Sequence, residues 1–440
     1  MFSLTKFRFG NLLNLRNQFN NNSFRNINTL VPWSKQKDLN PIRITGANKE
    51  YLFSENRKIV DFTSGLMVVN LGHNNKYIQE GFHKHIKTGI GYTSPFFGLE
   101  ERERLSERLT NITGLKEGKV FYTNGGADAN EVGIFLALEY LKGLGKNEQY
   151  RTLSFKKSFH GGSSIVSSLI SGDDRKIGKL NHFNEFTNKL ESIVPNPYLS
   201  DNGENTLIFI ENEFKKGNVA SILFEGSSGT AGIVLYPKYF LQKVKNLCNR
   251  YGVVFICDEV MSGWGRTGTL FGYQQHNIIP DIITTAKAIT NGYVQLGSVM
   301  ISNKISQHFE NNLVLTGLTY FGHPLACSIA NKCLDLYLEN DMEIVNISQE
   351  KGKDLTLLGK EIENNVSVVK DYRNNGMLGC FELNIQDDIK LLKIYKDILD
   401  NNIFVFRRNN LFFTAPPLII DDNILKETMN KLGDIFNKYI

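Results

Sequence analysis

The sequence predicts an α/β fold with a mostly parallel sheet covered by helices. Short apolar segments, each bounded by turn or polar residues, recur through the middle of the chain, as buried parallel strands do. Stretches with helical spacing separate several of these segments, and this alternation is typical of strand–helix–strand units. The chain has 440 residues, whereas a single core stops growing near roughly 250–300 residues. We therefore expect one large subunit with two closely packed lobes.

The N-terminal segment differs in composition from the rest of the chain. Residues 1–37 contain no Asp or Glu, and basic residues alternate there with Phe and Leu. A basic, amphipathic, acid-free leader is typical of a mitochondrial transit peptide, whereas a secretory signal has an uninterrupted apolar stretch. We therefore predict a transit peptide over 1–30 and a location in the mitochondrial matrix. The alternative is a disordered, Asn-rich tail, since Asn20, Asn21 and Asn22 are consecutive.

The remaining elements are expected in three groups. Residues 31–75 are expected to form the N-terminal part of a small domain, because 42–62 alternates apolar runs with turn residues, as small antiparallel sheets do. A large domain is expected over 76–318, with strands at 120–122, 152–154, 219–224, 253–257 and 282–285 and helices at 98–112, 129–141 and 237–251. Residues 319–440 show a helix, mixed strands and a final helix at 422–438, which predicts the rest of a small α+β domain.

Composition argues against several classes of function. The net charge of +5 is small for this length and lies partly in the N-terminal segment, so we expect no nucleic-acid-binding face. No run of ~18 apolar residues is present, and we expect no transmembrane helix. The five cysteines are scattered, without Cys-x-x-Cys spacing or neighbouring His, which indicates reduced thiols and no metal site.

Two predicted strands deliver chemically active side chains. The apolar strand at 253–257 ends in Asp258 and Glu259, and ligands bind beyond the carboxyl ends of strands in open α/β sheets. A carboxylate there could hold a protonated heteroaromatic nitrogen, although Asp258 could also simply cap the next turn. The apolar strand at 282–285 leads to Lys287. An apolar setting lowers the pKa of a lysine and makes it a nucleophile and base; the alternative is an ordinary surface lysine.

Two glycine-containing turns follow other predicted strands. Gly126 and Ala127 precede the helix predicted at 129–141, and backbone amides at a helix N-terminus bind phosphate. The alternative is a simple capping turn. Phe159 and His160 precede two glycines, and an aromatic ring there could stack on a flat cofactor. The alternative is a core Phe beside a loop His.

Together these segments resemble the class III aminotransferases, which depend on pyridoxal 5'-phosphate (PLP). The resemblance runs from about residue 33 to the C-terminus, and the taurine–pyruvate and ω-amino-acid–pyruvate branch is the most similar. It is carried by FTSGLMVVNLGH at 62–73, FYTNGGADANE at 121–131, FHGG at 159–162, FEGSSGTAGIVLYP at 224–237, ICDEVMSGWGRTG at 256–268, PDIITTAKAITNGYVQLG at 280–297, TYFGHPLA at 319–326 and APPLII at 415–420. It implies PLP fold type I (aspartate-aminotransferase-like), PLP as cofactor, and a homodimer with shared active sites.

The resemblance also implies roles for individual residues. Lys287 would form a Schiff base with the cofactor aldehyde and then shuttle protons, and Asp258 would pair with the pyridine nitrogen. Glu225 matches a family carboxylate near the cofactor, with a purely structural role as the alternative. The other positions implied at the cofactor are Gly126 and Ala127 at the phosphate, Phe159 and Val260 on the two ring faces, His160, and Thr319, which would reach the phosphate of the neighbouring subunit.

The substrate end departs from some relatives. Phe413 stands three residues ahead of Pro416, where ornithine-type members carry a carboxylate-binding Arg. The pair Arg407-Arg408 matches the loop that carries the substrate arginine in the ω-amino-acid branch. A guanidinium suits a carboxylate or sulfonate, so we expect Arg408 to bind substrate, with Arg407 or two solvated arginines as alternatives. Three further residues are expected at the substrate pocket, or else in plain packing: Trp33, Met67 and Tyr92.

The predicted reaction moves an amino group from an ω-amino acid or related amine to a keto acid such as pyruvate. Lys287 acts as general base and then acid, while Asp258 keeps the ring nitrogen protonated so that the cofactor accepts charge. The alternatives are another reaction of the same fold, such as that of an aminomutase or decarboxylase, and a non-catalytic relative. The sequence leaves open the amine and the choice between dimer and tetramer.

Overall fold

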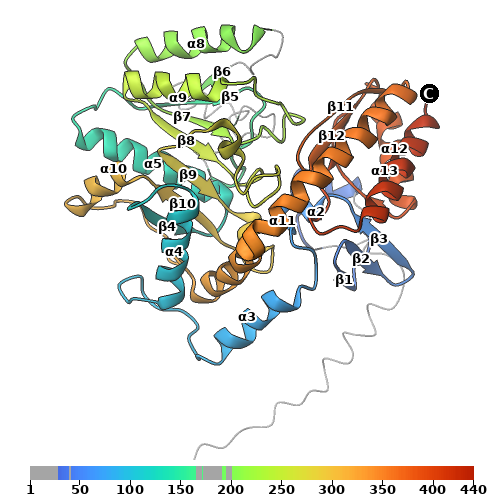
Figure 1. Cartoon of the computed structure of the whole chain (residues 1–440), viewed down its shortest axis with the longest axis horizontal. Coiled ribbons are helices and arrows are strands. Elements are labelled where there is room, and N and C mark those ends of the chain that lie inside the picture. Colours follow the sequence, from blue (N-terminus) through green and yellow to red (C-terminus); the bar gives the residue numbers. More distant parts are fainter. Residues whose placement is uncertain (1–27, 39–40, 165–170, 172–190, 195–200) are drawn as a thin grey trace, which may run out of the picture.

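The computed structural model describes residues 28–38, 41–164, 171, 191–194 and 201–440 (Figure 1). Most of the predicted transit peptide therefore lies outside the described residues. The described chain contains one large sheet with helices around it, and two smaller sheets beside it. Within these residues, no helix combines the length and the apolar character needed to cross a membrane.

The large sheet has seven strands in the order β4-β10-β9-β8-β7-β5-β6. The pairs β9·β8, β8·β7, β7·β5 and β5·β6 are parallel, and β10 is antiparallel to both of its neighbours. This confirms the predicted mostly parallel sheet. The strands are β4 (Lys119–Thr123), β5 (Arg151–Phe155), β6 (Glu191–Val194), β7 (Val219–Glu225), β8 (Val254–Asp258), β9 (Ile282–Thr285) and β10 (Gly297–Ile301).

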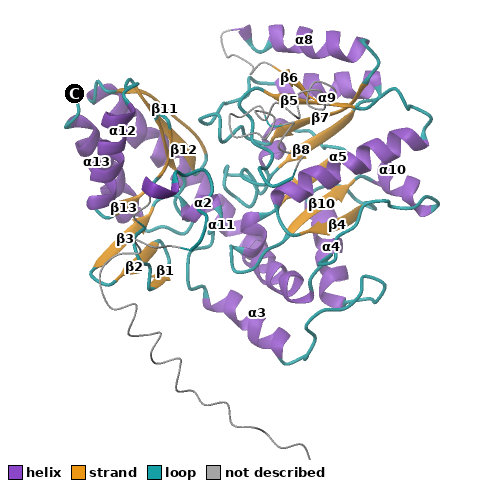
Figure 2. Cartoon of the chain, turned by 180° about the vertical axis from the view of Figure 1, so that it is seen from behind, coloured by secondary structure: helices purple, strands orange, loops and turns teal. Residues whose placement is uncertain are grey.

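Helices cover both faces of the large sheet (Figure 2). On one face, α5 (Gly126–Gly143) packs its apolar side chains against those of β7 to β10 in one buried cluster. Burying such a face is the main stabilising term, at roughly 25 cal/mol per Å² of apolar surface. The other helices beside the sheet are α4 (Glu100–Ile112), α8 (Glu204–Lys215), α9 (Phe240–Tyr251) and α10 (Asn303–Ser306), whereas α3 (Lys76–Ile86) packs against the long helix α11 (Pro324–Asn365).

The two smaller sheets bring the ends of the chain together. β1 (Gly46–Asn48), β2 (Tyr51–Ser54) and β3 (Arg57–Asp61) are antiparallel, as predicted, and β13 (Ile403–Phe404) joins β3 in parallel. The second small sheet is antiparallel, in the order β11-β12-β15-β14. Its strands are β11 (Val369–Asn375), β12 (Leu378–Leu383), β14 (Phe406–Arg408) and β15 (Leu411–Thr414).

Long helices connect and cover these parts. α11 (Pro324–Asn365) is interrupted by non-helical backbone from Glu339 to Met342, and it contacts α3 and α4 as well as β11 and α13. It therefore joins the large sheet to the second small sheet (Figure 1). The remaining helices are the short α2 (Ser64–Met67), α12 (Asp388–Asp400) and α13 (Asp422–Asn437). The domain boundaries at 30, 75 and 318 stay a prediction.

A buried arginine also ties distant segments together. Arg266 donates from Nη1 to Pro416 O at 2.6 Å and to Met377 O at 3.1 Å, and from Nη2 to Asn70 Oδ1 at 2.7 Å. Burial lowers its pKa to about 10. Because its acceptors are distributed over three segments, this one side chain joins the N-terminal, central and C-terminal parts of the chain.

Candidate functional site

A cavity of about 1170 Å³ opens at one edge of the large sheet. The strands β4, β5, β7, β8 and β9 run in the same direction, and the residues that follow their carboxyl ends meet there, as in other open α/β sheets. Nine of the residues predicted for the site line the cavity: Trp33, Gly126, Ala127, Phe159, His160, Glu225, Asp258, Val260 and Lys287.

Asp258 is buried at the end of β8 and is fixed by hydrogen bonds to both carboxylate oxygens. The backbone N–H of Val260 donates to Oδ1 at 2.9 Å. Asn130 Nδ2 donates to Oδ2 at 2.7 Å, and His160 Nδ1 lies 2.8 Å from the same oxygen. A buried carboxylate held by several donors is stabilised as an anion. Asp258 is therefore a carboxyl group held in a fixed orientation at the wall of the cavity.

Asn130 was missed by the sequence analysis. It lies on α5, and its orientation is set by Thr284 of β9, whose hydroxyl donates to Asn130 Oδ1 at 2.6 Å. The amide nitrogen must then point to Asp258, and it also donates to His160 O at 2.9 Å. An Asn among the buried residues of α5, which are otherwise apolar residues, Gly and Tyr, is the only sequence signal for this role.

Lys287 lies two residues beyond the end of β9 and is half-buried between the buried Ala286 and Ala288. It begins a short 3₁₀ turn, and its φ of 54° lies in the left-handed region. Non-glycine residues rarely adopt this conformation, and those that do occur often at functional sites. The fold thus turns the chain sharply so that Lys287 lines the cavity.

The N-terminus of α5 faces the cavity with Gly126 and Ala127. A side chain at Gly126 would place its Cβ 2.7 Å from Val260 Cγ1, so only glycine fits between helix and cavity wall. The turn before the helix is held by Asp128, which accepts from Asn124 N at 2.7 Å. The positive end of the helix dipole and the closely approaching backbone make this end of the cavity suited to a phosphate.

Glu225 ends β7, one strand away from Asp258. Burial raises the pKa of Glu225 to about 7, the charge of Asp258 adds to this effect, and the charges of His160 and Lys287 oppose it. Ser228 Oγ donates to Glu225 Oε2 at 3.0 Å. A carboxyl group with this pKa can change protonation near neutral pH.

Glu259, the second acid of the Asp258-Glu259 pair, does not line the cavity. It is fully buried and accepts from Gly272 N at 2.9 Å, Tyr273 N at 2.8 Å and Ser262 Oγ at 2.7 Å. Burial raises its pKa. Glu259 therefore fixes the loop after β8, and Asp258 is the acid of the pair that a ligand can reach.

Aromatic side chains line the open part of the cavity. Phe159 and Trp33 contact each other edge to face, with ring centroids 6.0 Å apart. Trp33 remains 58% exposed. Further lining residues that the sequence analysis did not name as site residues include Thr230, Met261, Tyr293, Tyr320 and His323.

Four predicted residues do not line the cavity of this chain: Met67, Tyr92, Thr319 and Arg408. Met67 is buried in an apolar cluster with Phe413. The hydroxyl of Tyr92 donates to Thr319 O. Arg408 Nη1 donates to Thr230 O at 2.8 Å and so reaches the cavity wall, whereas Arg407 Nη1 donates to Asn409 O at 3.0 Å.

No cluster of three or more His, Cys, Asp or Glu in the described part of the chain could hold a metal ion. The five cysteines are buried and unpaired, and burial raises the pKa of each thiol well above its usual range. A low thiol pKa is what makes cysteine nucleophilic, so these residues are not candidates for catalysis.

Comparisons with known proteins agree with this geometry. The family model "Aminotransferase class-III" matches residues 34–436. Vanillin aminotransferase of Capsicum chinense is 30% identical over 364 residues, which cover 75% of this chain and 76% of that protein. Gamma aminobutyrate transaminase 2 of Solanum lycopersicum is also 30% identical, over 74% and 75%.

Solved structures show the same fold. The taurine:2-oxoglutarate aminotransferase of Bifidobacterium kashiwanohense, in complex with PLP and glutamate, superposes with a TM-score of 0.84. It is 26% identical, and the match covers 99% of each chain.

Proposed function

This chain belongs to the class III aminotransferases, enzymes of PLP-dependent transamination, and from that premise we propose that it transfers an amino group from an ω-amino acid or related amine to a keto acid such as pyruvate. The observation that carries the proposal is the pairing of Asp258 and Lys287 in one cavity. Asp258 supplies a carboxyl group in a fixed orientation and Lys287 supplies an amine. The N-terminus of α5, which is suited to phosphate, lines the same cavity.

The cavity fits PLP at three points. Its volume of about 1170 Å³ is ample for the cofactor and a small substrate. The N-terminus of α5 is suited to the phosphate, and Val260 leaves no room there for a Cβ at position 126. Asp258, held by three hydrogen-bond donors, offers a partner for the pyridine nitrogen.

When bound, PLP supplies an electron sink for the negative charge that develops at the amine-bearing carbon. Lys287 removes the proton from that carbon and later returns a proton, acting as base and then as acid. Asp258 keeps the ring nitrogen protonated, and His160, Asn130 and Val260 N hold its carboxylate in place. Phe159 lines the same cavity and would lie against the bound ring and keep water from it.

The substrate side supports a donor that lacks an α-carboxylate. Phe413 is fully buried in an apolar cluster with Met67 and Leu378, so it provides no positive charge for a carboxylate. Arg408 reaches the cavity wall at Thr230 and is our proposed partner for the distal carboxylate or sulfonate. The bidentate guanidinium matches either group. The solved relative named for taurine is consistent with this class of substrate.

We also propose that the active unit is a homodimer. Large apolar side chains are exposed, including Phe96 at 95% and Leu313 at 82%, as at surfaces that bind another protein. Thr319 does not line the cavity of its own chain, and we assign it to the phosphate of the partner.

The acid-free composition of residues 1–37 supports our proposal that a leader over about 1–30 directs the chain to the mitochondrial matrix.

The test is a screen of amines against the purified holoenzyme. Taurine, β-alanine, 4-aminobutyrate and ornithine are added singly, and the absorbance of the lysine-bound cofactor is followed. An ω-amino acid is expected to bleach the band, and pyruvate is expected to restore it with formation of alanine. Turnover without any keto acid would instead indicate an aminomutase or decarboxylase.

A further inference from the structure

The loop at residues 226–234 borders the cavity and has a strained backbone. Thr230 of this loop lines the cavity. Gly232 has a φ of 95° and Ile233 a φ of 58°. A β-branched residue in the left-handed region costs of order 1–3 kcal/mol and persists only where the surroundings hold it. Ile233 is fully buried, so the strain lies within packed structure next to the cavity.

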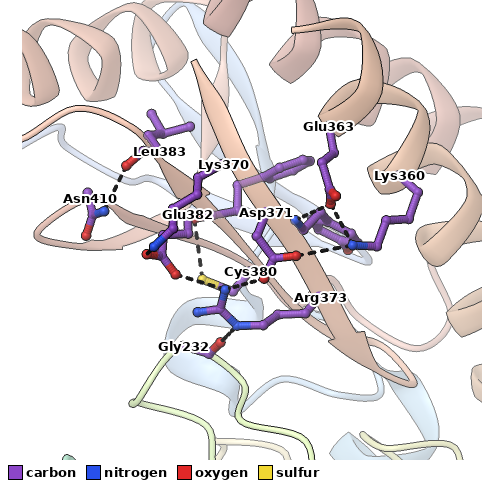
Figure 3. Close-up of polar contacts among 12 residues, drawn as sticks. Gly232, Lys360, Glu363, Lys370, Asp371, Arg373, Cys380, Glu382, Leu383 and Asn410 are labelled. Carbon is purple, nitrogen blue, oxygen red and sulfur yellow. Dashed lines mark hydrogen bonds and ion pairs between the residues drawn. The ribbon is translucent and has the colours of Figure 1, made fainter. Parts of the chain in front are cut away.

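Arg373 of the second small sheet contacts this loop directly. Its Nε donates to Gly232 O, while its Nη1 donates to Asp371 Oδ2 at 2.6 Å and to Glu382 Oε2 at 3.0 Å. Figure 3 shows the guanidinium between the two carboxylates and the Gly232 carbonyl. The planar guanidinium can satisfy all three acceptors at once because its donors point in fixed, divergent directions.

The two carboxylates are placed to hold Arg373. Asp371 and Glu382 are directly opposite each other on β11 and β12, where like charges repel. Lys360 contacts Asp371 at 3.2 Å and Lys370 contacts Glu382 at 2.7 Å (Figure 3). Burial alone would raise the pKa of both acids, but hydrogen bonds from Arg373 and from these lysines outweigh it and lower the pKa. Both acids are therefore charged and fix the arginine head.

A second contact from the same strand reaches the same loop. Asn375 lies two residues beyond Arg373 on β11, and side chains two apart share a face of a strand. Asn375 Nδ2 donates to Ser227 Oγ at 3.2 Å. The fit is tight, because a Cβ at Gly232 would lie 2.6 Å from Arg373 Nη2. One face of β11 thus holds the loop at two points.

We propose that Arg373 is a positioning residue that holds the strained 226–234 loop in the shape that forms the substrate side of the cavity. The inference rests on the proposed function, since it concerns how that same site binds its amine. Arg373 does not touch the cofactor site itself. Its loss should therefore affect binding of the substrate and leave the cofactor bound.

The test compares the holoenzymes of wild type, Arg373→Lys, Asn375→Ala and Lys370→Met. Arg373→Lys keeps the positive charge beside Asp371 and Glu382, but one ammonium group cannot also reproduce the fixed bond to Gly232 O. Lys370→Met is the matched control, because it removes a cation from Glu382 without contact to the loop. The measurements are hydrogen–deuterium exchange of residues 226–234, the cofactor absorbance, and the KM and kcat for the best amine.

In Arg373→Lys we expect hydrogen exchange in the loop to be about ten-fold faster and KM for the amine to be about ten-fold higher. Changes of this size correspond to the loss of one charged hydrogen bond. The cofactor band and kcat should change little, and Asn375→Ala should show a smaller change in the same direction. Lys370→Met should stay close to wild type, because Arg373 still pairs with Glu382 and keeps its own bond to the loop. If Arg373→Lys does not fold, Asn375→Ala against Lys370→Met decides the question.

Two results would overturn the inference. One is equal loop exchange and equal KM in Arg373→Lys and Lys370→Met. The other is an Arg373→Lys variant that loses both bound cofactor and thermal stability while its KM stays unchanged, which would make the role of Arg373 purely structural. A wild type that transaminates no amine would refute the proposed function alone, and the exchange measurement would still show whether Arg373 holds the loop.

Discussion

The two halves of the cavity are built in different ways. The half that we propose for the cofactor, defined by Lys287, Asp258, Asn130 and His160, lies on the ends of neighbouring strands and on the helix α5 that packs against them. The proposed substrate half has Thr230 at the cavity wall, and its loop is held from behind by Arg373, Arg408 and Phe413 of the second small sheet, which do not line the cavity themselves.

This difference follows from what each half must do. The proposed cofactor half is fixed by a chain of short, buried hydrogen bonds from Thr284 through Asn130 to Asp258, so the orientation of Asp258 is set before any ligand binds. The substrate half is held by polar contacts between two separate sheets. Such contacts can vary without disturbing the chemistry, which is how one fold accommodates different amines.

The largest effect is expected from removing the amine of the cofactor half. Lys287→Ala deletes the proposed acid and base, and a positioned proton-transfer group contributes roughly 10²–10⁴-fold to the rate. We expect multiple turnover to be lost and the absorbance band of the lysine-bound cofactor to disappear, while the protein still folds. Borohydride trapping followed by mass spectrometry checks the site, and labelling of any lysine other than Lys287 would refute the assignment.

A smaller loss is expected when the support of Asp258 is removed. Asn130→Ala removes one charged hydrogen bond to the carboxylate, a change of about 1.5–3 kcal/mol or roughly 10–100-fold. The loss should appear in kcat and in cofactor retention, with KM for the amine nearly constant. Thr152→Val is the control, because Thr152 bonds Ser221 in the same buried sheet at 2.8 Å without contact to Asp258. Equal losses in both variants would mean that the effect is only one of sheet stability.

Part of this comparison could be made from the sequence alone. The strands that end in Asp258 and precede Lys287 were predicted because each is a short apolar run with a charged candidate residue at or just after its end. The antiparallel β10 was missed, since its first residues, Gly297 and Ser298, resemble a turn more than a strand. Arg373 and Gly232 were missed because they are 141 residues apart, and no local pattern reports a contact over that distance.

Glu225 lies between the two halves, and its pH dependence sharpens the division. Its pKa in the folded chain is raised to about 7, mainly by burial. Protonated Glu225 stabilises the folded chain fully at a pH below the pKa that this group has in the unfolded chain. This stabilisation is lost as the pH rises through about 7, the pKa in the folded chain. Glu225→Gln does not ionise, so its free energy of unfolding should rise relative to wild type by about 2 kcal/mol between about pH 5.5 and pH 8.5.

Urea denaturation at a series of pH values measures this change. Glu213→Gln serves as a control of opposite sign. Although burial opposes it, ion pairs with Lys216 and Arg151 lower the pKa of Glu213, so this variant should lose stability relative to wild type above the unfolded pKa. A pH-independent difference between Glu225→Gln and wild type would show that the carboxyl group is not held in its neutral form.

The smallest expected effect separates two adjacent arginines of the substrate half. Arg408 reaches Thr230 at the cavity wall, whereas Arg407 bonds its neighbour Asn409. Arg408→Met should raise KM for a carboxylate-bearing amine about ten-fold, the cost of one charged hydrogen bond. Because it also removes the hydrogen bond to Thr230 O, KM for an amine without an acidic group should rise as well, but by less. Arg407→Met should alter neither. Because Arg407 and Arg408 share a strand and a charge, a difference in KM between the two variants depends on the position of the side chain alone. If Arg408→Met raises KM equally for both amines, the substrate carboxylate binds elsewhere in the cavity.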